Sequence, residues 1–354
     1  MNERGVVLIE VLVALLISLA VLGALFGLVA PAERLFQRQP EAADLQQRMR
    51  EGFRRLHADL LMAGAGPEEH ALGRLGELRP AILPYVLGAT PQMGEGFPYR
   101  PGALSLLSVP MQVRPRATIG SPLHGSSAHV VLDPGQRCSG RDPLCGFPSE
   151  GLVLVFDEAG RSDLFRLADA RGNTLHLVRI ATASARAYAP GAHIVPVELD
   201  SYYVDSRRGE LRHHDGWNAN FPVIDDVVGF SVRLFGQPGP PGPPLMQAVS
   251  DCLFSEDGQP RLPALGSGAA LTELGEGVLS DGPWCEHAGD PYDADLHRVQ
   301  RIAIFLRLQV SAWHLRGVAR SWFQNVGENR EVGRTVRDYE LNFEVTPRNL
   351  DGGH

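Results

Sequence analysis

A single carboxylate lies inside the most apolar stretch of this chain. The stretch runs from Val6 to Val29, and Glu10 is its only charged residue. A helix of about 20 apolar residues is long enough to cross a bilayer, so we expect a membrane-spanning helix here. A charged residue within such a helix costs roughly 2.5–3.5 kcal/mol on insertion scales. Glu10 is therefore expected to have a specific partner.

Cleavage of the chain after Gly5 would create that partner, because it would leave a free α-amino group on Val6. The start of a helix also favours negative charge, through the helix dipole. In a bundle of such helices, Glu10 of one copy would pair with the amine of Val6 of its neighbour. The carboxylate would then direct assembly.

The residues Gly5-Val6-Val7-Leu8-Ile9-Glu10 resemble the class III leader of type IV pilins and pseudopilins. The resemblance implies that a prepilin peptidase cuts after Gly5 and methylates the new amino group of Val6. It also implies that Glu10 makes the assembly salt bridge with a neighbouring subunit. The chain departs from the family pattern in its first two mature residues, which are usually Phe and then Thr or Ser; here both are Val.

Two other interpretations of this stretch stay open. A secretory signal has an apolar region of about 7–15 residues, which is shorter than this one, although Ala30-Pro31-Ala32 offers a small-residue cleavage site. A plain membrane anchor fits the length but leaves Glu10 unexplained. The positive-inside rule weakly opposes a cytoplasmic N-terminus, because basic residues are more frequent after the stretch than before it.

The composition limits the function classes. With 354 residues and 44% hydrophobic content, the chain can bury the core of one large domain or two modest ones. Its net charge of −8 gives no basic footprint for nucleic-acid binding, so no nucleic-acid partner is expected.

Four cysteines lie beyond the apolar stretch, at Cys138, Cys145, Cys252 and Cys285. An even number outside a membrane indicates disulfides. Three pairings are possible, and we prefer Cys138 with Cys145 and Cys252 with Cys285, because each pair brackets a Gly/Pro-rich loop. A zinc site is the alternative, but the close C-x2-C spacings that it favours are absent.

A second helical pattern follows in residues 30–66. Pro31 and Pro40 are expected to kink the helix, and Gly64, Gly66 and Pro67 to end it. One apolar stripe repeats at helical spacing, which indicates an amphipathic helix packed on a globular head. The stripe consists of Leu45, Met49, Phe53, Leu56 and Leu60.

Residues 67–354 are expected to form that head, and their pattern predicts strands. Short β-rich runs lie between Gly, Pro, Asp and Ser clusters. In the run from Tyr339 to Val345 apolar and polar residues alternate, which predicts a half-buried antiparallel strand. Together with the long helix they predict an α+β fold in which the helix packs on an antiparallel sheet. The expected strands are Leu104–Val109, His129–Leu132, Leu152–Phe156, Leu164–Leu167, Leu175–Ile180, Ile194–Val204, Val227–Phe235, Ile302–Val310 and Tyr339–Val345.

Short motifs in the head extend the resemblance to PilW-type minor pilins and the related J-type pseudopilins. Their order along the chain matches that of the family, which implies a pilin-like fold. They are the helix end DLLMAG at 59–64, the hairpin motif YYVD…GELR at 202–212, the strand start RVQRI at 298–302 and the closing segment VTPRNL at 345–350.

Residues 237–297 fall outside the resemblance and are expected to be a loop insertion. The insertion begins with a Pro/Gly-rich segment that favours polyproline II geometry. Its end is acidic, with Asp281, Glu286, Asp290, Asp293 and Asp295. These residues could offer oxygen ligands to Ca²⁺, with Asp290, Asp293 and Asp295 the weak candidates, but their spacing matches no EF-hand loop. A solvated acidic loop is the default expectation.

No catalytic motif is visible, so neither an enzymatic activity nor a cofactor is expected. His213 and His214 precede Asp215 at a hairpin end and are expected in a surface turn. No G-x-S-x-G elbow, H-E-x-x-H or phosphate-binding loop occurs.

The resemblance implies a minor type IV pilin at or near the pilus tip that primes assembly. Its partners would be other pilins, contacted through the N-terminal helix, and the prepilin peptidase. The chain would first span the inner membrane, with a cytoplasmic N-terminus and a periplasmic head, and would then reach the cell-surface pilus. The alternatives are a J-like pseudopilin of type II secretion and an adhesin or DNA-uptake pilin that uses its insertion.

Overall fold

The computed structural model describes most of the chain, and it shows an α+β fold with antiparallel sheets. The described residues are 3–66, 75, 79–86, 99–100, 102–110, 117–125, 127–132, 147–148, 150–157, 161–172, 174–179, 187–240, 252–266, 268, 270–285, 292–312, 315–316 and 336–350.

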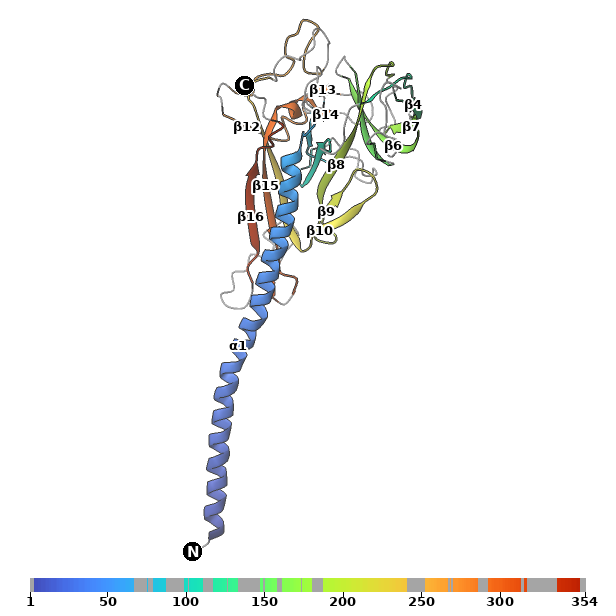
Figure 1. Ribbon diagram of the computed structural model, residues 1–354. Coiled ribbons are helices and arrows are strands. Elements are labelled where there is room, and N and C mark those ends of the chain that lie inside the picture. Colours follow the sequence, from blue (N-terminus) through green and yellow to red (C-terminus); the bar gives the residue numbers. More distant parts are fainter. Residues whose placement is uncertain are drawn as a thin grey trace.

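Helix α1 (Glu3–Met62) contains 60 residues and is about 90 Å long at 1.5 Å per residue. It continues as a helix through both Pro31 and Pro40. Figure 1 shows that its N-terminal half projects away from the head, while its C-terminal half lies along the head. The helix ends where predicted, because Gly64 adopts a φ of +74°, which glycine reaches without strain.

The predicted apolar stripe faces the head. Leu45, Met49, Leu56 and Leu60 are buried, and the ring of the half-buried Phe53 packs edge-on against Phe343, with 4.8 Å between the ring centroids. The period of 3.6 residues therefore identified the buried face correctly.

A ten-stranded sheet has the order β1-β2-β8-β5-β6-β7-β4, with β3, β9 and β10 paired off this path. The long strand β8 connects its parts, because it pairs with β2, β3, β5 and β9. The strands are β1 (Ile82–Leu83), β2 (Ala103–Ser108), β3 (Ala117–Thr118), β4 (Ser127–Val131), β5 (Gly151–Phe156), β6 (Ser162–Arg171), β7 (Thr174–Arg179), β8 (His193–Asp205), β9 (Glu210–His214) and β10 (Asn220–Ile224).

A second sheet of four strands packs against α1, in the order β12-β11-β15-β16 (Figure 1). Its strands are β11 (Val227–Gly236), β12 (Thr272–Leu274), β15 (Val299–Leu308) and β16 (Tyr339–Val345). Strands β15 and β16 pair without a register shift, from Ile302 opposite Val345 to Leu308 opposite Tyr339. The expected two-residue alternation in β16 is confirmed, since Leu341, Phe343 and Val345 are less exposed than Glu340, Asn342 and Glu344.

Two hydrophobic cores result. The larger one joins α1 to both sheets, and the smaller one lies within the lobe of β4, β6 and β7, away from α1 (Figure 1). Strand β5 serves both cores: Leu152, Leu154 and Phe156 face the larger, and Val153 and Val155 the smaller.

Residues 237–297, the expected loop insertion, include short regular elements among their described residues. They contain β12, the short pair β13 (Trp284–Cys285) and β14 (Tyr292–Asp293), and most of the 3-10 helix η1 (Ala294–Arg298). These elements escaped sequence reasoning because runs of two or three residues are too short to show a period.

Gly52 is the point of closest approach between α1 and the head. A Cβ atom there would lie 2.0 Å from Cδ1 and 2.3 Å from Cγ1 of the buried Ile224 on β10. Gly→Ala normally favours a helix by about 1 kcal/mol. Here we expect Gly52→Ala to lower the free energy of unfolding by about 1–2 kcal/mol, because overpacking costs about 1–3 kcal/mol. Chemical denaturation of the protein in detergent measures this change.

The matched control is Gly23→Ala on the same helix, where a Cβ would meet nothing within 4 Å. It should leave stability unchanged or slightly higher. Shortening the opposing side chain with Ile224→Val should partly rescue Gly52→Ala. A stabilising Gly52→Ala variant would contradict the packing described here.

Candidate functional site

The N-terminal half of α1 presents an apolar surface that no described part of the head covers. The window Glu10–Gly27 has a mean hydropathy of 2.4, none of it is buried, and it is long and apolar enough to cross a membrane. Phe26 and Leu16 are 72% and 66% exposed. Glu10 is exposed on this surface, and Gly5 and Val6 lie in the same helix.

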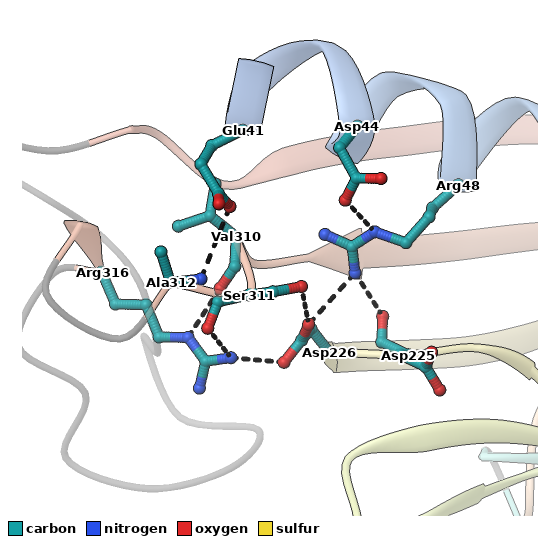
Figure 2. Close-up of polar contacts among 9 residues, drawn as sticks. All are labelled: Glu41, Asp44, Arg48, Asp225, Asp226, Val310, Ser311, Ala312 and Arg316. Carbon is teal, nitrogen blue, oxygen red and sulfur yellow. Dashed lines mark hydrogen bonds and ion pairs between the residues drawn. The ribbon is translucent and has the colours of Figure 1, made fainter. Parts of the chain in front are cut away.

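A polar cluster fastens α1 to the head where the helix first meets it. Arg48 donates hydrogen bonds to the carboxylates of Asp44 (2.8 Å) and Asp226 (3.1 Å), and to the backbone oxygen of Asp225 (3.2 Å). Figure 2 shows Arg48 reaching from α1 to the turn between β10 and β11. We call this set, together with Ser311 and Arg316, the junction cluster.

Asp226 is the centre of the junction cluster. It accepts hydrogen bonds from Arg48, from the hydroxyl of Ser311 (2.6 Å) and from Arg316, so two arginines approach it from two sides (Figure 2). Its φ of +55° is an αL conformation that aspartate tolerates better than most residues. The turn therefore directs the carboxylate of Asp226 toward α1 and toward the segment that follows β15, which contains Ser311 and Arg316.

Replacing Asp226 with alanine should loosen the junction, because both arginines lose their shared counterion. The side chains of Arg48, Asp226 and Arg316 are 18%, 20% and 26% exposed, so water screens the pairs only partly. We expect the free energy of unfolding to fall by roughly 1–2 kcal/mol. The control is Asp44→Ala, whose side chain is 54% exposed and contacts Arg48 within one helix; it should cost less than about 0.5 kcal/mol. Equal effects of the two variants would show that Asp226 has no special role.

A second polar cluster lies at the C-terminal end of α1. The hydroxyl of Tyr202 on β8 donates a hydrogen bond to Asp59, and Nε2 of His213 on β9 lies 2.6 Å from Oδ1 of Asp200 on β8. Asn349 donates to the backbone oxygen of Ala63, at 3.5 Å. Residues of three separate sequence motifs, DLLMAG, YYVD and VTPRNL, therefore meet at one place.

His213 and His214 are not in a surface turn, so that expectation was wrong. Both lie on β9 and are buried, with exposures of 3% and 8%. The His213 ring packs between those of Tyr202 and Phe221, at centroid distances of 5.1 and 4.9 Å. The hairpin turns only after Asp215, whose carboxylate accepts from backbone N–H groups of the turn.

Burial raises the pKa of Asp59 above its usual range, and the hydrogen bond from Tyr202 opposes the rise. Burial also raises the pKa of Tyr202, so the phenol keeps its proton and acts as the donor. It raises the pKa of Glu198 as well, with the charge of Asp200 adding to the effect.

The Asp59 shift gives a pH prediction. Because its pKa is higher in the folded chain than in the unfolded chain, charged Asp59 lowers stability at neutral pH, and this cost disappears below pH ~4. Asp59→Asn keeps an acceptor for Tyr202 without the charge. We expect it to raise the free energy of unfolding at pH 7 and to match the wild type near pH 4. Asp59→Ala leaves the Tyr202 hydroxyl without its acceptor and should be less stable than the wild type at both pH values. If Asp59→Asn is also less stable at both pH values, the raised pKa of Asp59 is refuted.

Arg298 fixes the insertion to the head. Its guanidinium donates to the backbone oxygens of Pro238 (3.0 Å), Gly239 and Pro263, and it forms an ion pair with Asp295. The side chains of Arg298 and Asp295 are 0% and 3% exposed. A buried arginine thus satisfies carbonyl groups that a Pro/Gly-rich segment cannot pair within a sheet.

The structure joins Cys252 to Cys285 by a disulfide, with 5.0 Å between the Cα atoms, as preferred from the sequence. Cys138 and Cys145 lie outside the described residues. The Cys252–Cys285 bond joins two parts of the insertion to each other, so the disulfide closes the insertion internally while Arg298 binds it to the head.

The solvated acidic loop was a wrong expectation for Asp293 and Asp295, because both are buried and have structural roles. Asp293 is 1% exposed; it caps η1 and accepts from the N–H groups of Asp295 and Gly282, at 2.9 and 2.7 Å. Asp281, Asp293 and Asp295 do offer grouped oxygens. Burial raises the pKa of Asp295 to about 6, and the charge of Arg298 opposes this rise. Glu286 and Asp290 lie outside the described residues, and among the described ones Arg298 pairs with Asp295 of this group.

Sequence reasoning missed Asp226, Arg48 and Ser311 as a group. The Asp225-Asp226 pair between two strand patterns was a detectable turn signal, but nothing in the sequence indicates its partner on α1. Searches of protein-family models, of curated proteins and of solved structures find no match to this chain.

Proposed function

We propose that this chain is a minor type IV pilin, a structural subunit that enters a filament through its N-terminal helix. The observation that carries the proposal is the projecting apolar half of α1, which carries Glu10 and which no other described part of the chain covers. A soluble protein would not leave such a surface exposed. Burial between neighbouring helices would cover it and would give Glu10 its partner.

The helix offers two different faces to neighbours. Gly23 and Gly27 form a G-x-x-x-G pair with open space beside both residues. Such pairs allow close contact between membrane helices. At 100° per residue, they lie about 220° and 260° around the helix from Glu10. A helix with a polar assembly residue on one side and small residues on another suits a bundle with several neighbours better than a simple pair.

The junction cluster suits a subunit in which the helix must position the head. Among the described residues, the first polar contacts between the helix and the head are at Glu41 and Arg48, whereas the apolar window ends at Gly27. The helical rise between Gly27 and Glu41 is about 21 Å. The head would therefore stand clear of the bilayer or of the filament core, and Arg48 with Asp226 would keep it in one orientation.

The meeting of the quoted motifs at the end of α1 also supports the family resemblance. In the sequence these motifs are separate and individually short, yet Asp59 contacts Tyr202, and Asn349 contacts Ala63. These three motifs, DLLMAG, YYVD and VTPRNL, all pack at the end of α1, which explains why they would occur together in one family. We further propose processing by a prepilin peptidase after Gly5 and insertion in the inner membrane before assembly.

The insertion does not favour an adhesin or DNA-uptake role as a separate module. Arg298, which precedes β15, binds the backbone of the insertion's first residues, and the Cys252–Cys285 disulfide closes the insertion internally, so it forms part of the architecture. The alternative, a J-like pseudopilin, would use the same apolar helix with Glu10, but it would assemble in a type II secretion system and not in a pilus.

Site-specific photo-crosslinking in cells tests the proposal. A photoreactive residue at Leu16, in the exposed apolar window, should crosslink to other subunits that carry such a helix. The same residue at Leu61, which is 37% exposed beside the head, should not crosslink to their helices. Sheared filaments that contain the protein favour the pilus; a secretion defect without filament loss favours the pseudopilin. Crosslinks to lipid alone would contradict both.

A further inference from the structure

Three potential metal ligands from three elements converge where α1 ends on the head. They are Asp59 from α1, Asp200 from β8 and His213 from β9, and each offers one ligand atom within 4.8 Å of the other two. Asp200 and His213 lie on the paired strands β8 and β9, and the end of α1 brings the distant Asp59 to them. The donor set is mixed, with one imidazole nitrogen and two carboxylates.

The imidazole is held firmly in place. The side chain of His213 is 4% exposed, and its ring lies between those of Tyr202 and Phe221. This packing directs Nε2 into the cluster, 2.6 Å from Oδ1 of Asp200. A cation at this point would lie beside both the ring nitrogen and the carboxylate oxygen.

The charge around the cluster favours a cation. Asp59, Asp200 and Glu198 interact as like charges, and the nearby groups of opposite sign are Arg55 and His213. Arg55 is exposed, and its guanidinium lies over the ring of Phe221, 4.8 Å from the ring centroid. Three carboxylates and one arginine therefore surround the imidazole.

The cluster is also open on one side. The side chain of Asp200 is 27% exposed, and Asp59 is of intermediate exposure. An ion could enter from the solvent, and water could complete its coordination. The other acidic group, at Asp281, Asp293 and Asp295, differs in this respect, because Arg298 and the cap of η1 already occupy its buried oxygens.

We propose that Asp59, Asp200 and His213 bind a divalent transition-metal ion of the zinc class, which ties the end of α1 to strands β8 and β9. Zn²⁺ accepts nitrogen and carboxylate oxygen ligands at about 2.0–2.2 Å, which places neighbouring ligand atoms about 3.4 Å apart in a tetrahedral site. The observed separations, from 2.6 Å to at most 4.8 Å, bracket this value, so side-chain adjustments suffice. The fourth ligand would be water. The inference concerns the head and does not depend on the proposed filament role.

The test uses the full-length protein in detergent, stripped of metal with a chelator that is then removed. Calorimetric titration with Zn²⁺ should show one bound equivalent per chain and a higher unfolding temperature. Co²⁺ in place of Zn²⁺ should give visible absorption bands typical of a four- or five-coordinate site. Asp59→Asn and Asp200→Asn should each weaken Zn²⁺ binding at least about tenfold, because each removes one anionic ligand.

Matched variants separate this site from other potential ligands. His129 and His176 stack across β4 and β7 with 4.6 Å between their ring centroids, and they could bind metal on the surface. His129→Gln with His176→Gln, and separately Asp281→Asn, should leave the single equivalent and its affinity unchanged. Arg55→Gln should tighten binding, because it removes the competing positive charge.

The folding of each variant is checked by circular dichroism and by denaturation without metal. Asp59→Asn is a suitable ligand variant, since it keeps the acceptor for Tyr202 and is expected to fold. The proposal is overturned if Zn²⁺ does not bind, or if the folded Asp59→Asn variant binds Zn²⁺ as the wild type does. It is also overturned if the His129/His176 pair accounts for the bound equivalent.

Discussion

Replacing Glu10 with leucine is expected to leave the chain in the membrane but to lower its amount in sheared filaments at least about tenfold. The substitution makes the apolar window more hydrophobic, so insertion should not suffer. Assembly should suffer because the amine of Val6 on the neighbouring subunit loses its counterion within an apolar bundle. An energy of about 1.4 kcal/mol already corresponds to a tenfold change in an equilibrium, and a charge in such surroundings costs more than this.

Glu10→Gln separates charge from size. It keeps the shape of the side chain but not the charge, and it should fail nearly as severely as Glu10→Leu. Glu51→Gln is the control on the same helix, since Glu51 is exposed and pairs only with Arg54 among the described residues. Immunoblots of the membrane and filament fractions provide the measurement. If Glu10→Leu enters filaments as well as Glu51→Gln does, then Glu10 is not an assembly residue.

Replacing Arg298 with methionine is expected to lower the free energy of unfolding by about 3–5 kcal/mol, the usual cost of removing one partner of a buried ion pair. Methionine fills a similar volume but donates no hydrogen bond. Asp295 would keep a buried carboxylate without its cation, and the backbone oxygens of Pro238, Gly239 and Pro263 would lose their donor. Chemical denaturation of the detergent-solubilised protein measures the loss.

Arg233→Met is the control for the loss of an arginine. Arg233 lies on β11, its side chain is 57% exposed, and its pair with Glu273 is 3.6 Å long. Exposed pairs contribute about 0–1 kcal/mol, so a change below about 0.5 kcal/mol is expected. In the Arg298 variant the insertion should also become sensitive to protease before the strands of the sheet do. Equal stability of the two variants would mean that Arg298 does not hold the insertion.

The regular parts of the fold could be predicted from the sequence because their signals are periodic. The stripe from Leu45 to Leu60 has the period of a helix, and the alternation from Tyr339 to Val345 has that of a strand; both were confirmed. The end of α1 was predicted from Gly64, since the left-handed backbone there favours glycine. These signals depend only on near neighbours in the chain.

The junctions could not be predicted, because their partners are distant in sequence. Arg48 and Asp226 are 178 residues apart, and Asp59 and Tyr202 are 143 apart. Each of these polar residues is ordinary in its own segment, and its role comes from the partner. His213 was misplaced for the same reason: next to His214 and Asp215 it resembles a turn residue, whereas the packing of Tyr202 and Phe221 buries it.

The mass of the mature amino terminus tests the central claim most directly. The protein would be isolated from the envelope fraction of its native cells, digested, and its N-terminal peptide sequenced by tandem mass spectrometry. We predict a chain that begins at Val6 and carries a methyl group on its α-amine, the group that Glu10 of a neighbouring subunit would contact. An envelope protein that retains residues 1–5, or a protein found only in a soluble fraction, would contradict the account.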